Sequence, residues 1–404
     1  MASIPDQDHS GFRPSMLLND RRYRGLTYQF IALIVIIFLM AWLGMNLVSN
    51  LAAAGLNFSY SFLGDPAGYD INQALIEYDS QSSHLRAAIV GLLNTLLVAI
   101  MGCITATVIG VTAGVLRLSK NWLVARLMSL YVEAFRNVPV LIWILMIGTI
   151  VQLGPSPRVY LGEEPERGLI FGLFAFTNRG ITSPAPIWEA GSVWVVVALV
   201  ASIVAAWAYM RFRKKALFSS GTLYPAWPVL PILVVPAVAF YFILGQPIGL
   251  NMPDTLANRF NLSGGFEIQR PLIALWLALS VYTGAFIAEN VRAGILAVSK
   301  GQTEAAASLG LRPRRIMNLV ILPQALRVII PPLISQYLNL TKNSSLAIAV
   351  GYADITATLG GITLNQTGRA IESILLLMLF YLVISLSISA AMNVYNASVA
   401  LKER

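Results

Sequence analysis

Long apolar runs, separated by short polar stretches, dominate the pattern of this chain. Most of them reach the roughly 20 residues that a helix needs to cross the hydrocarbon core of a membrane. The runs lie at residues 26–48, 88–116, 138–154, 191–210, 226–245, 271–290, 322–340 and 373–395. The pattern therefore predicts an all-α integral membrane protein with about eight transmembrane helices. Two runs are less clear, because 138–154 is short and 226–245 contains three prolines.

Composition supports the same class. Hydrophobic residues make up 57% of the 404 residues and charged residues only 12%, which is far from the balance of a soluble globular protein. A net charge of +9 raises the question of nucleic-acid binding. Such binding would need basic residues interleaved with aromatic residues on one soluble face, and the sequence shows none.

The distribution of Lys and Arg predicts the orientation instead. If both termini are cytoplasmic, 20 of the 28 basic residues fall on the inner side, as the positive-inside rule requires. These residues are Arg13, Arg21, Arg22, Arg24, Arg117, Lys120, Arg126, Arg136, Arg211, Arg213, Lys214, Lys215, Arg292, Lys300, Arg312, Arg314, Arg315, Arg327, Lys402 and Arg404. We therefore expect cytoplasmic N- and C-termini.

The runs and loops divide the chain into six segments. In order, they are a cytoplasmic tail (1–25), the first span with a periplasmic loop (26–87), the first part of a helical core (88–154), an insertion with two spans (155–270), the second part of the core (271–395) and a cytoplasmic tail (396–404). The first span follows basic residues, as a secretion signal would. It is longer than the roughly 7–15 apolar residues of a signal core, so we expect a retained anchor.

A polar, basic stretch between two apolar runs is the most informative motif. Residues 304–323 read EAAASLGLRPRRIMNLVILP. The alanines favour helix and leave little side-chain bulk, so a partner could approach the backbone closely. We expect Glu304 in the first turn, where a negative charge suits the helix dipole, and Gly310 at the helix end. The alternative is an ordinary loop with a surface helix, but the glycine and the downstream Ile-Leu-Pro favour a docking loop.

This stretch resembles the EAA loop of importer permeases in the ATP-binding-cassette (ABC) class. The residues at the matching positions are Glu304, Ala305, Ala306, Gly310, Ile321, Leu322 and Pro323. Further motifs at 91–96, 131–139, 282–294, 299–304, 322–327 and 342–347 resemble the polar amino-acid branch of these permeases (histidine, glutamine and general L-amino-acid systems). The length and the insertion look most like the larger permease subunit of Aap/Bzt-type general L-amino-acid systems.

The resemblance implies a function and a set of partners. It implies a type I ABC importer core of five helices with an inserted pair of spans, in the bacterial inner membrane. The chain would move L-amino acids, with broad specificity for polar ones, from periplasm to cytoplasm. The loop at 291–323 would couple it to two copies of a separate ATPase. A second permease subunit (in a heterodimer) and a periplasmic amino-acid-binding protein would complete the system.

The sequence lacks the motifs of an enzyme or a metalloprotein. No phosphate-binding loop of the Gly-x-x-x-x-Gly-Lys-Ser/Thr type occurs, so ATP and Mg are expected only on the partner ATPase. His9 and His84 are isolated and lie far from metal-ligand spacing. Nothing resembles a pair of nucleophile and base. We therefore expect a translocation subunit that has no cofactor, no metal and no enzymatic activity of its own.

Polar residues in the seventh run are the candidates for a substrate pathway. Pro331 and Pro332 are expected to break this span and to release backbone carbonyls. Beyond them, a spacing of three and four places three amides on one helical face. The predicted pathway residues are Gln336, Asn339, Asn343 and Ser344. Hydrogen bonding between helices is the alternative interpretation for each of them.

Comparison with the resembled family bears on selectivity. Relatives usually read Lys-Asp-Thr-Ser-Leu where this chain has an amide at Asn343, and some relatives for basic amino acids have a carboxylate at the position of Gln336. Both positions are neutral here. A neutral face cannot pair with a cation, so strong selection for arginine or lysine by this subunit is not expected.

Two other classes of protein compete with this interpretation. An ion-gradient-driven secondary amino-acid transporter often has buried carboxylates or repeated halves, whereas these spans have almost no ionisable residue and the halves do not match. A membrane scaffold without transport would have no reason for the docking loop. Glu289 and Arg292, three residues apart at the end of the sixth run, are expected to form an ordinary ion pair.

Overall fold

The computed structural model describes residues 21–53, 55, 57–162, 165, 167–222, 224–255 and 260–399. The chain forms two compact units, Met1–Asp65 and Pro66–Arg404. The described part of the first unit contains helix α2 (Arg21–Ala53) and a short 3₁₀ turn, η1 (Ser61–Gly64). Helix α2 is apolar nearly throughout and is long enough to span a membrane. Arg13, Lys402, Arg404 and most of the two predicted tails lie outside the described residues.

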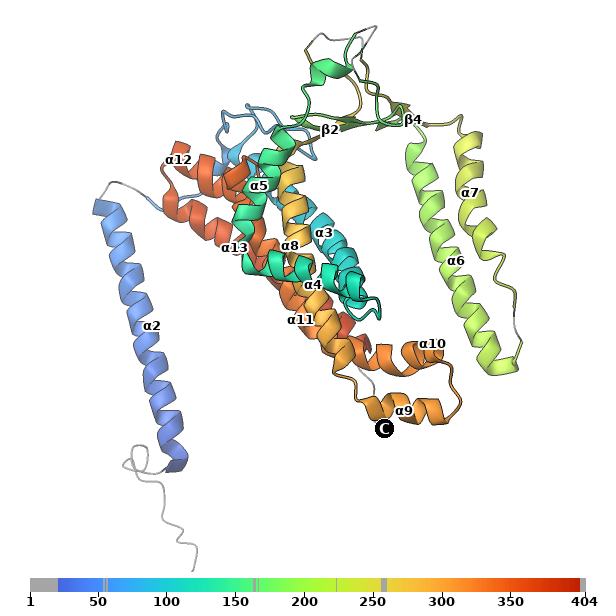
Figure 1. The fold of residues 1–404 in the computed structure, drawn as a ribbon. Helices are drawn as coiled ribbons and strands as arrows, with labels where there is room; N and C mark the ends of the chain where they lie inside the picture. Colours follow the sequence, from blue (N-terminus) through green and yellow to red (C-terminus); the bar gives the residue numbers. More distant parts are fainter. Residues whose placement is uncertain are drawn as a thin grey trace, which may run out of the picture. The chain divides into compact units, whose positions relative to one another are not determined.

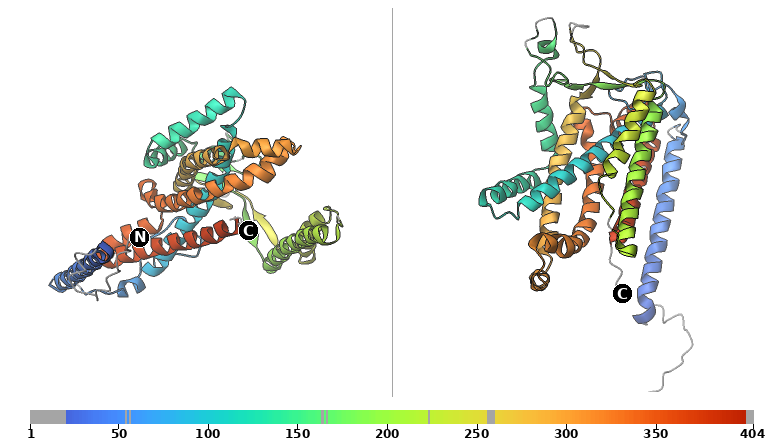
Figure 2. Two further views of the ribbon diagram at one scale, coloured as in Figure 1. Left: turned by 90° about the horizontal axis from the view of Figure 1, so that it is seen from below. Right: turned by 90° about the vertical axis from the view of Figure 1, so that its right-hand side faces the viewer.

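The core of the second unit is a helical bundle (Figures 1 and 2). Its long helices are α3 (His84–Leu116), α8 (Arg270–Leu296), α11 (Leu322–Asn343) and α13 (Ala370–Val399), with α4 (Trp122–Asn137) and α5 (Val140–Gln152) beside them. Helices α3 and α8 make the most extensive contact in the molecule. Fully buried aliphatic side chains from α3, α5, α8 and α11 meet in one cluster, among them Val98, Ile144, Leu275 and Leu340.

The structure does not confirm the count of eight membrane spans that the apolar runs predicted. In the described residues, six helices are long and apolar enough to cross a membrane, or up to seven if α4 and α5 count as one span. Helices α4 and α5 meet at 107°, around Pro139, which has no N–H to continue the helical hydrogen bonds of α4. Helix α7 (Val229–Ile243) has 15 residues, fewer than the ~20 of a full span.

The insertion is not wholly helical, and this departs from the all-α prediction. It contains the helical hairpin of α6 (Ser192–Ser220) and α7, a 3₁₀ turn η2 (Pro157–Tyr160), and two small antiparallel sheets. The first sheet joins β1 (Ala175–Phe176), β2 (Gly180–Ser183) and β5 (Phe266–Gln269); the second joins β3 (Ala185–Trp188) and β4 (Ile248–Asn251). Pairing of Gly180 with Gln269 joins the strand β2 to the segment before α8, and pairing of Trp188 with Ile248 closes the base of the α6–α7 hairpin. The whole protein remains mostly helical.

Short helices lie at both ends of the core (Figure 1). At one end are α9 (Lys300–Ser308), α10 (Pro313–Ile316) and the π-helical turn η3 (Met317–Ile321), which leads into α11. We call this the α9 end. At the other end, which we call the sheet end, are the strands and α12 (Leu364–Thr367), and η4 (Ser344–Val350) and η5 (Thr356–Thr363) connect α11 to α12.

Candidate functional site

The predicted docking helix exists, but it begins earlier than the sequence suggested. Helix α9 starts at Lys300, after Ser299 in an extended conformation. Glu304 is therefore the fifth residue of the helix and not part of its first turn, so the proposed interaction with the helix dipole is wrong. The side chains of Glu304 and Ala305 are exposed, while Ala306 is buried on the side of α9 that contacts α10 and η3. The exposed side of α9 therefore includes small alanine side chains that project little from the helix backbone.

Gly310 ends α9 as expected, and the reason is its backbone conformation. Its φ angle is +74°, in the left-handed region that glycine adopts readily and β-branched residues adopt only with strain. Its N–H donates to the carbonyl of Ala307 at 2.9 Å, and the next N–H, of Leu311, donates to Ala306 at 3.4 Å. Nothing lies within 4 Å of a Cβ placed on Gly310. The backbone conformation, and not a lack of space for a side chain, therefore favours glycine at this position.

Residues 321–323, the last part of the motif, connect α9, α10 and η3 to the long helix α11 of the core. Ile321 ends η3, and Leu322 and Pro323 open α11 without a break in the helix. Gln324 bonds the two parts, because its Nε2 donates to Val320 O at 3.0 Å and to Gln302 Oε1 of α9 at 3.4 Å. Around these residues the α9 end exposes apolar Leu309 and Leu319 and basic side chains at 312, 314 and 315.

A cluster of charges lies where α3, α4 and α8 meet. Glu289 pairs with Arg292 at 2.7 Å, which confirms the ion pair expected from the sequence. The same carboxylate also pairs with Arg117, and Arg136 approaches it to 3.9 Å. The two additional arginines come from distant parts of the chain, so spacing alone could not reveal them. The carboxylate of Glu289 therefore links three helices. Nothing in this arrangement of charges indicates a catalytic or binding role.

The predicted pathway residues are only partly brought together. Gln336 and Asn343 are half-buried and Asn339 is exposed on one face of α11; within the described residues their side chains have no hydrogen-bond partner. Ser344 is fully buried and donates to Thr341 O at 2.7 Å, so it lies on a different face. The expected break is absent, since α11 continues through its two internal prolines.

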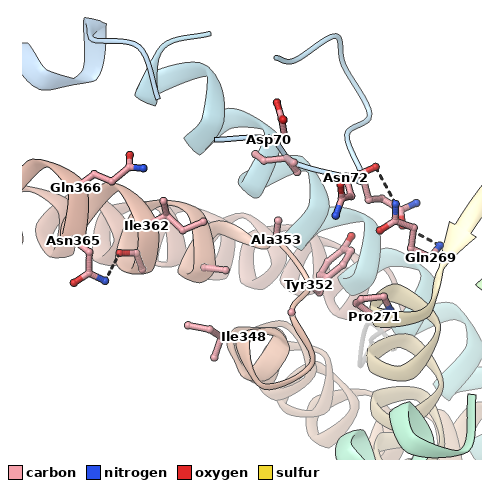
Figure 3. A pocket seen from close by; sticks show the side chains of 15 residues that line it. Asp70, Asn72, Gln269, Pro271, Ile348, Tyr352, Ala353, Ile362, Asn365 and Gln366 are labelled. Atoms are coloured by element: carbon pink, nitrogen blue, oxygen red, sulfur yellow. Dashed lines mark hydrogen bonds between the residues drawn. The ribbon is translucent and has the colours of Figure 1, made fainter. Parts of the chain in front are cut away.

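A cavity of about 600 Å³ opens at the sheet end of the core (Figure 3). We call it the amide pocket. Three separate segments form it: residues 70–73 before α3, residues 269–271 at the start of α8, and residues 348–366 after α11. The polar side chains in its lining are Asp70, Asn72, Gln73, Gln269, Asn365 and Gln366. The sequence analysis did not single out any of them, because no local pattern connects the three segments.

Hydrogen bonds from α3 hold the walls of the amide pocket in place. Asn94, fully buried, donates through Nδ2 to Gln73 O at 2.8 Å and to Ala353 O at 2.9 Å. Thr95 accepts a bond from Ile355 N at 3.1 Å. Both residues belong to the motif at 91–96, and an asparagine within an apolar run was a signal in the sequence. One α3 motif thus positions two of the three segments.

Asp354, behind the pocket wall, is a buried carboxyl group that the sequence analysis overlooked. It lies between the candidate spans that end at Val350 and begin at Ala370. Its Oδ1 accepts a bond from Ala357 N at 2.9 Å, and Tyr381 donates to Oδ2 at 3.4 Å. Burial raises the pKa of this carboxyl from 3.8 to about 6, since removal from water disfavours the charged form.

Comparisons with known proteins agree on one family. Residues 198–401 match the family described as "Binding-protein-dependent transport system inner membrane component". The chain is 51% identical to the glutamate/glutamine/aspartate/asparagine transport system permease protein BztB of Rhodobacter capsulatus, over the full length of both. It is 43% identical to the general L-amino acid transport system permease protein AapQ of Rhizobium johnstonii, with 97% of this chain and 96% of that one covered.

A solved structure also resembles the chain. The crystal structure of an amino acid ABC transporter with histidines matches with a TM-score of 0.45 and 19% identity. The match covers 78% of this chain and 95% of the other.

Proposed function

The chain belongs to the inner membrane components of binding-protein-dependent transport systems, as an amino-acid ABC transporter permease subunit, and from this premise we propose that it imports a broad range of polar L-amino acids. In this proposal the chain receives its substrate from a periplasmic binding protein and passes it to the cytoplasm. Energy comes from ATP hydrolysis on a separate subunit. The family membership argues against the alternative of a transporter driven by an ion gradient.

The α9 end supports docking of a separate ATPase. Helix α9 exposes Ala305 and Ala307, so another protein can contact its backbone closely. Leu309, 80% exposed, offers an apolar contact next to the basic residues at 312–315. A surface with a central apolar contact and charged surroundings is typical of a protein–protein interface. The hydrogen bond from Gln324 to Gln302 is one link between α9 and α11 at this end.

The amide face of α11 supports a pathway for uncharged or amide-bearing substrates. Gln336, Asn339 and Asn343 have donors and acceptors that no described residue uses, and polar groups of this kind in a span face a cavity or another helix. We propose that this face meets a second permease subunit, with the substrate passing between the two. Its lack of charge suits recognition of groups that all L-amino acids share.

The observation that carries the coupling proposal is the left-handed Gly310, and two substitutions at this position test it. Gly310→Val should abolish most of the substrate-stimulated ATP hydrolysis, at least about tenfold, because a β-branched residue adopts positive φ only with strain. Gly310→Asn is the matched control, since asparagine tolerates this conformation. The measurement is ATP hydrolysis by the reconstituted complex in liposomes, with binding protein and glutamine. Normal stimulation in the valine variant would contradict the docking role of this loop.

A further inference from the structure

The amide pocket has the size and chemistry of a small-molecule site. Its volume of about 600 Å³ lies within the roughly 300–1,000 Å³ of typical ligand pockets. Ile348, Ile362 and Ala353 lie in the middle of the lining (Figure 3). Polar side chains flank them on two sides. Asp70, Asn72 and Gln269 are on one side, and Asn365 and Gln366 are on the other (Figure 3).

Some of these polar side chains are exposed and have no hydrogen-bond partner in the described part of the protein, while others bond to neighbouring segments. Gln73 Oε1 accepts from Gln269 N at 3.3 Å, and Gln269 Nε2 donates to Asn72 O at 3.2 Å, so these two side chains hold the wall together. By contrast, the carboxylate of Asp70 and the side-chain amides of Asn72 and Gln366 have no hydrogen-bond or ion-pair partner among the described residues. These three groups are available to a ligand.

We propose that the amide pocket is a binding site for a polar, zwitterionic amino acid, occupied before the substrate reaches the amide face of α11. This inference rests on the proposed import function. The ammonium group of the ligand binds on the Asp70 side, because a carboxylate is its natural partner. The methylene groups of the side chain lie over Ile348 and Ile362. The terminal amide or carboxyl group binds the amide of Gln366 on the opposite side.

The position of the pocket fits a receiving site. Its lining includes the start of α8 and residues of η5 and α12, and α12 lies at the opposite end of the core from α9, where the ATPase is proposed to dock (Figure 1). The lining residue Ile348 belongs to η4, which begins directly after Asn343, the last amide of the α11 face. The chain therefore leads from the pocket to the proposed pathway within five residues. A neutral polar amino acid would pass from one set of amides to the next.

Direct binding of glutamine tests the proposal. The probe is radiolabelled L-glutamine, added to the intact permease–ATPase complex in lipid nanodiscs without binding protein or nucleotide. Wild type should bind it saturably. Gln366→Leu and Asp70→Asn should each weaken binding about tenfold, through the loss of one hydrogen bond or ion pair. Ile362→Trp should abolish binding by filling the cavity. Gln81→Leu, an exposed amide outside the pocket, is the control and should bind as wild type does.

Three other outcomes would each contradict the proposal. If Gln336→Leu on α11 removes binding while the pocket variants retain it, the substrate site lies on α11 and the proposal is wrong. If Ile362→Trp weakens capture of the purified binding protein but leaves glutamine affinity unchanged, the pocket receives a protein loop, which also overturns it. If wild type does not bind glutamine, the proposal is also wrong. ATP-dependent uptake of glutamine by wild type in proteoliposomes, measured in parallel, shows whether the import function itself holds.

Discussion

Asp354 shows at the residue scale how burial can make one carboxyl group sensitive to pH. Its pKa is about 6 in the folded protein and near 3.8 when exposed. Between these values the folded state keeps a proton that the unfolded state has lost, so stability falls as pH rises from about 4 to 6. Above about pH 6 the buried, charged carboxylate lowers the free energy of unfolding by on the order of 3 kcal/mol.

We expect Asp354→Asn to remove this penalty while keeping an acceptor for the N–H of Ala357. The variant should be at least as thermostable as wild type at pH 7.5, and its melting temperature should vary less between pH 4.5 and 7.5. Asp354→Ala should be less stable than Asp354→Asn at every pH, because alanine also loses the acceptor. Thermal unfolding of the purified protein in detergent measures both. Equal pH dependence in wild type and Asp354→Asn would assign the titration to another group.

At the scale of elements, small residues on α3 allow α8 to approach closely. A Cβ added to Gly110 would lie 2.5 Å from Ile287 Cβ and 2.8 Å from Gly284 O. Because one of these atoms belongs to the backbone of α8, the helices would have to separate. Close approach of this kind, through small residues, is how membrane helices pack.

Gly110→Leu should therefore destabilise the core by about 1–3 kcal/mol or prevent folding altogether. We expect less monodisperse protein after extraction in mild detergent and a lower melting temperature. Val108→Leu, at an exposed position of the same helix, also enlarges a side chain and should have little effect. A melting temperature of Gly110→Leu equal to that of wild type would mean that the α3–α8 contact tolerates separation.

At the scale of the whole molecule, the α6–α7 hairpin decides the membrane topology, because α7 is shorter than a full span. Ser183 and Asn72 lie at the sheet end, while Ser219 lies near the far end of α6, next to the basic residues 211–215. In a Cys103→Ala background, single cysteines at positions 72 and 183 should react with a membrane-impermeant maleimide from the periplasm. A cysteine at 219 should react only after the membrane is opened, since basic residues stay inside. Periplasmic labelling at 219 would show that the α6–α7 hairpin does not cross the bilayer.

The sequence by itself determined the class of the protein and the presence of a short helix that ends at Gly310. Apolar length is a local property, so six of the eight predicted spans appear as long helices. The role of Gly310 at the helix end was also predictable, because the need for a positive φ arises within one turn. The Glu289–Arg292 pair followed from helical spacing alone.

Only the tertiary structure decided which distant residues meet. The 107° bend between α4 and α5, the pairing of β2 with β5 and the contact of Asn94 with Ala353 all depend on segments far apart in the chain. The same holds for burial: Ser344 and Asp354 look like ordinary polar residues in the sequence and are inaccessible in the fold. Hydrophobic pattern sets where a helix forms, but the shape of its neighbours sets which of its polar groups face a ligand.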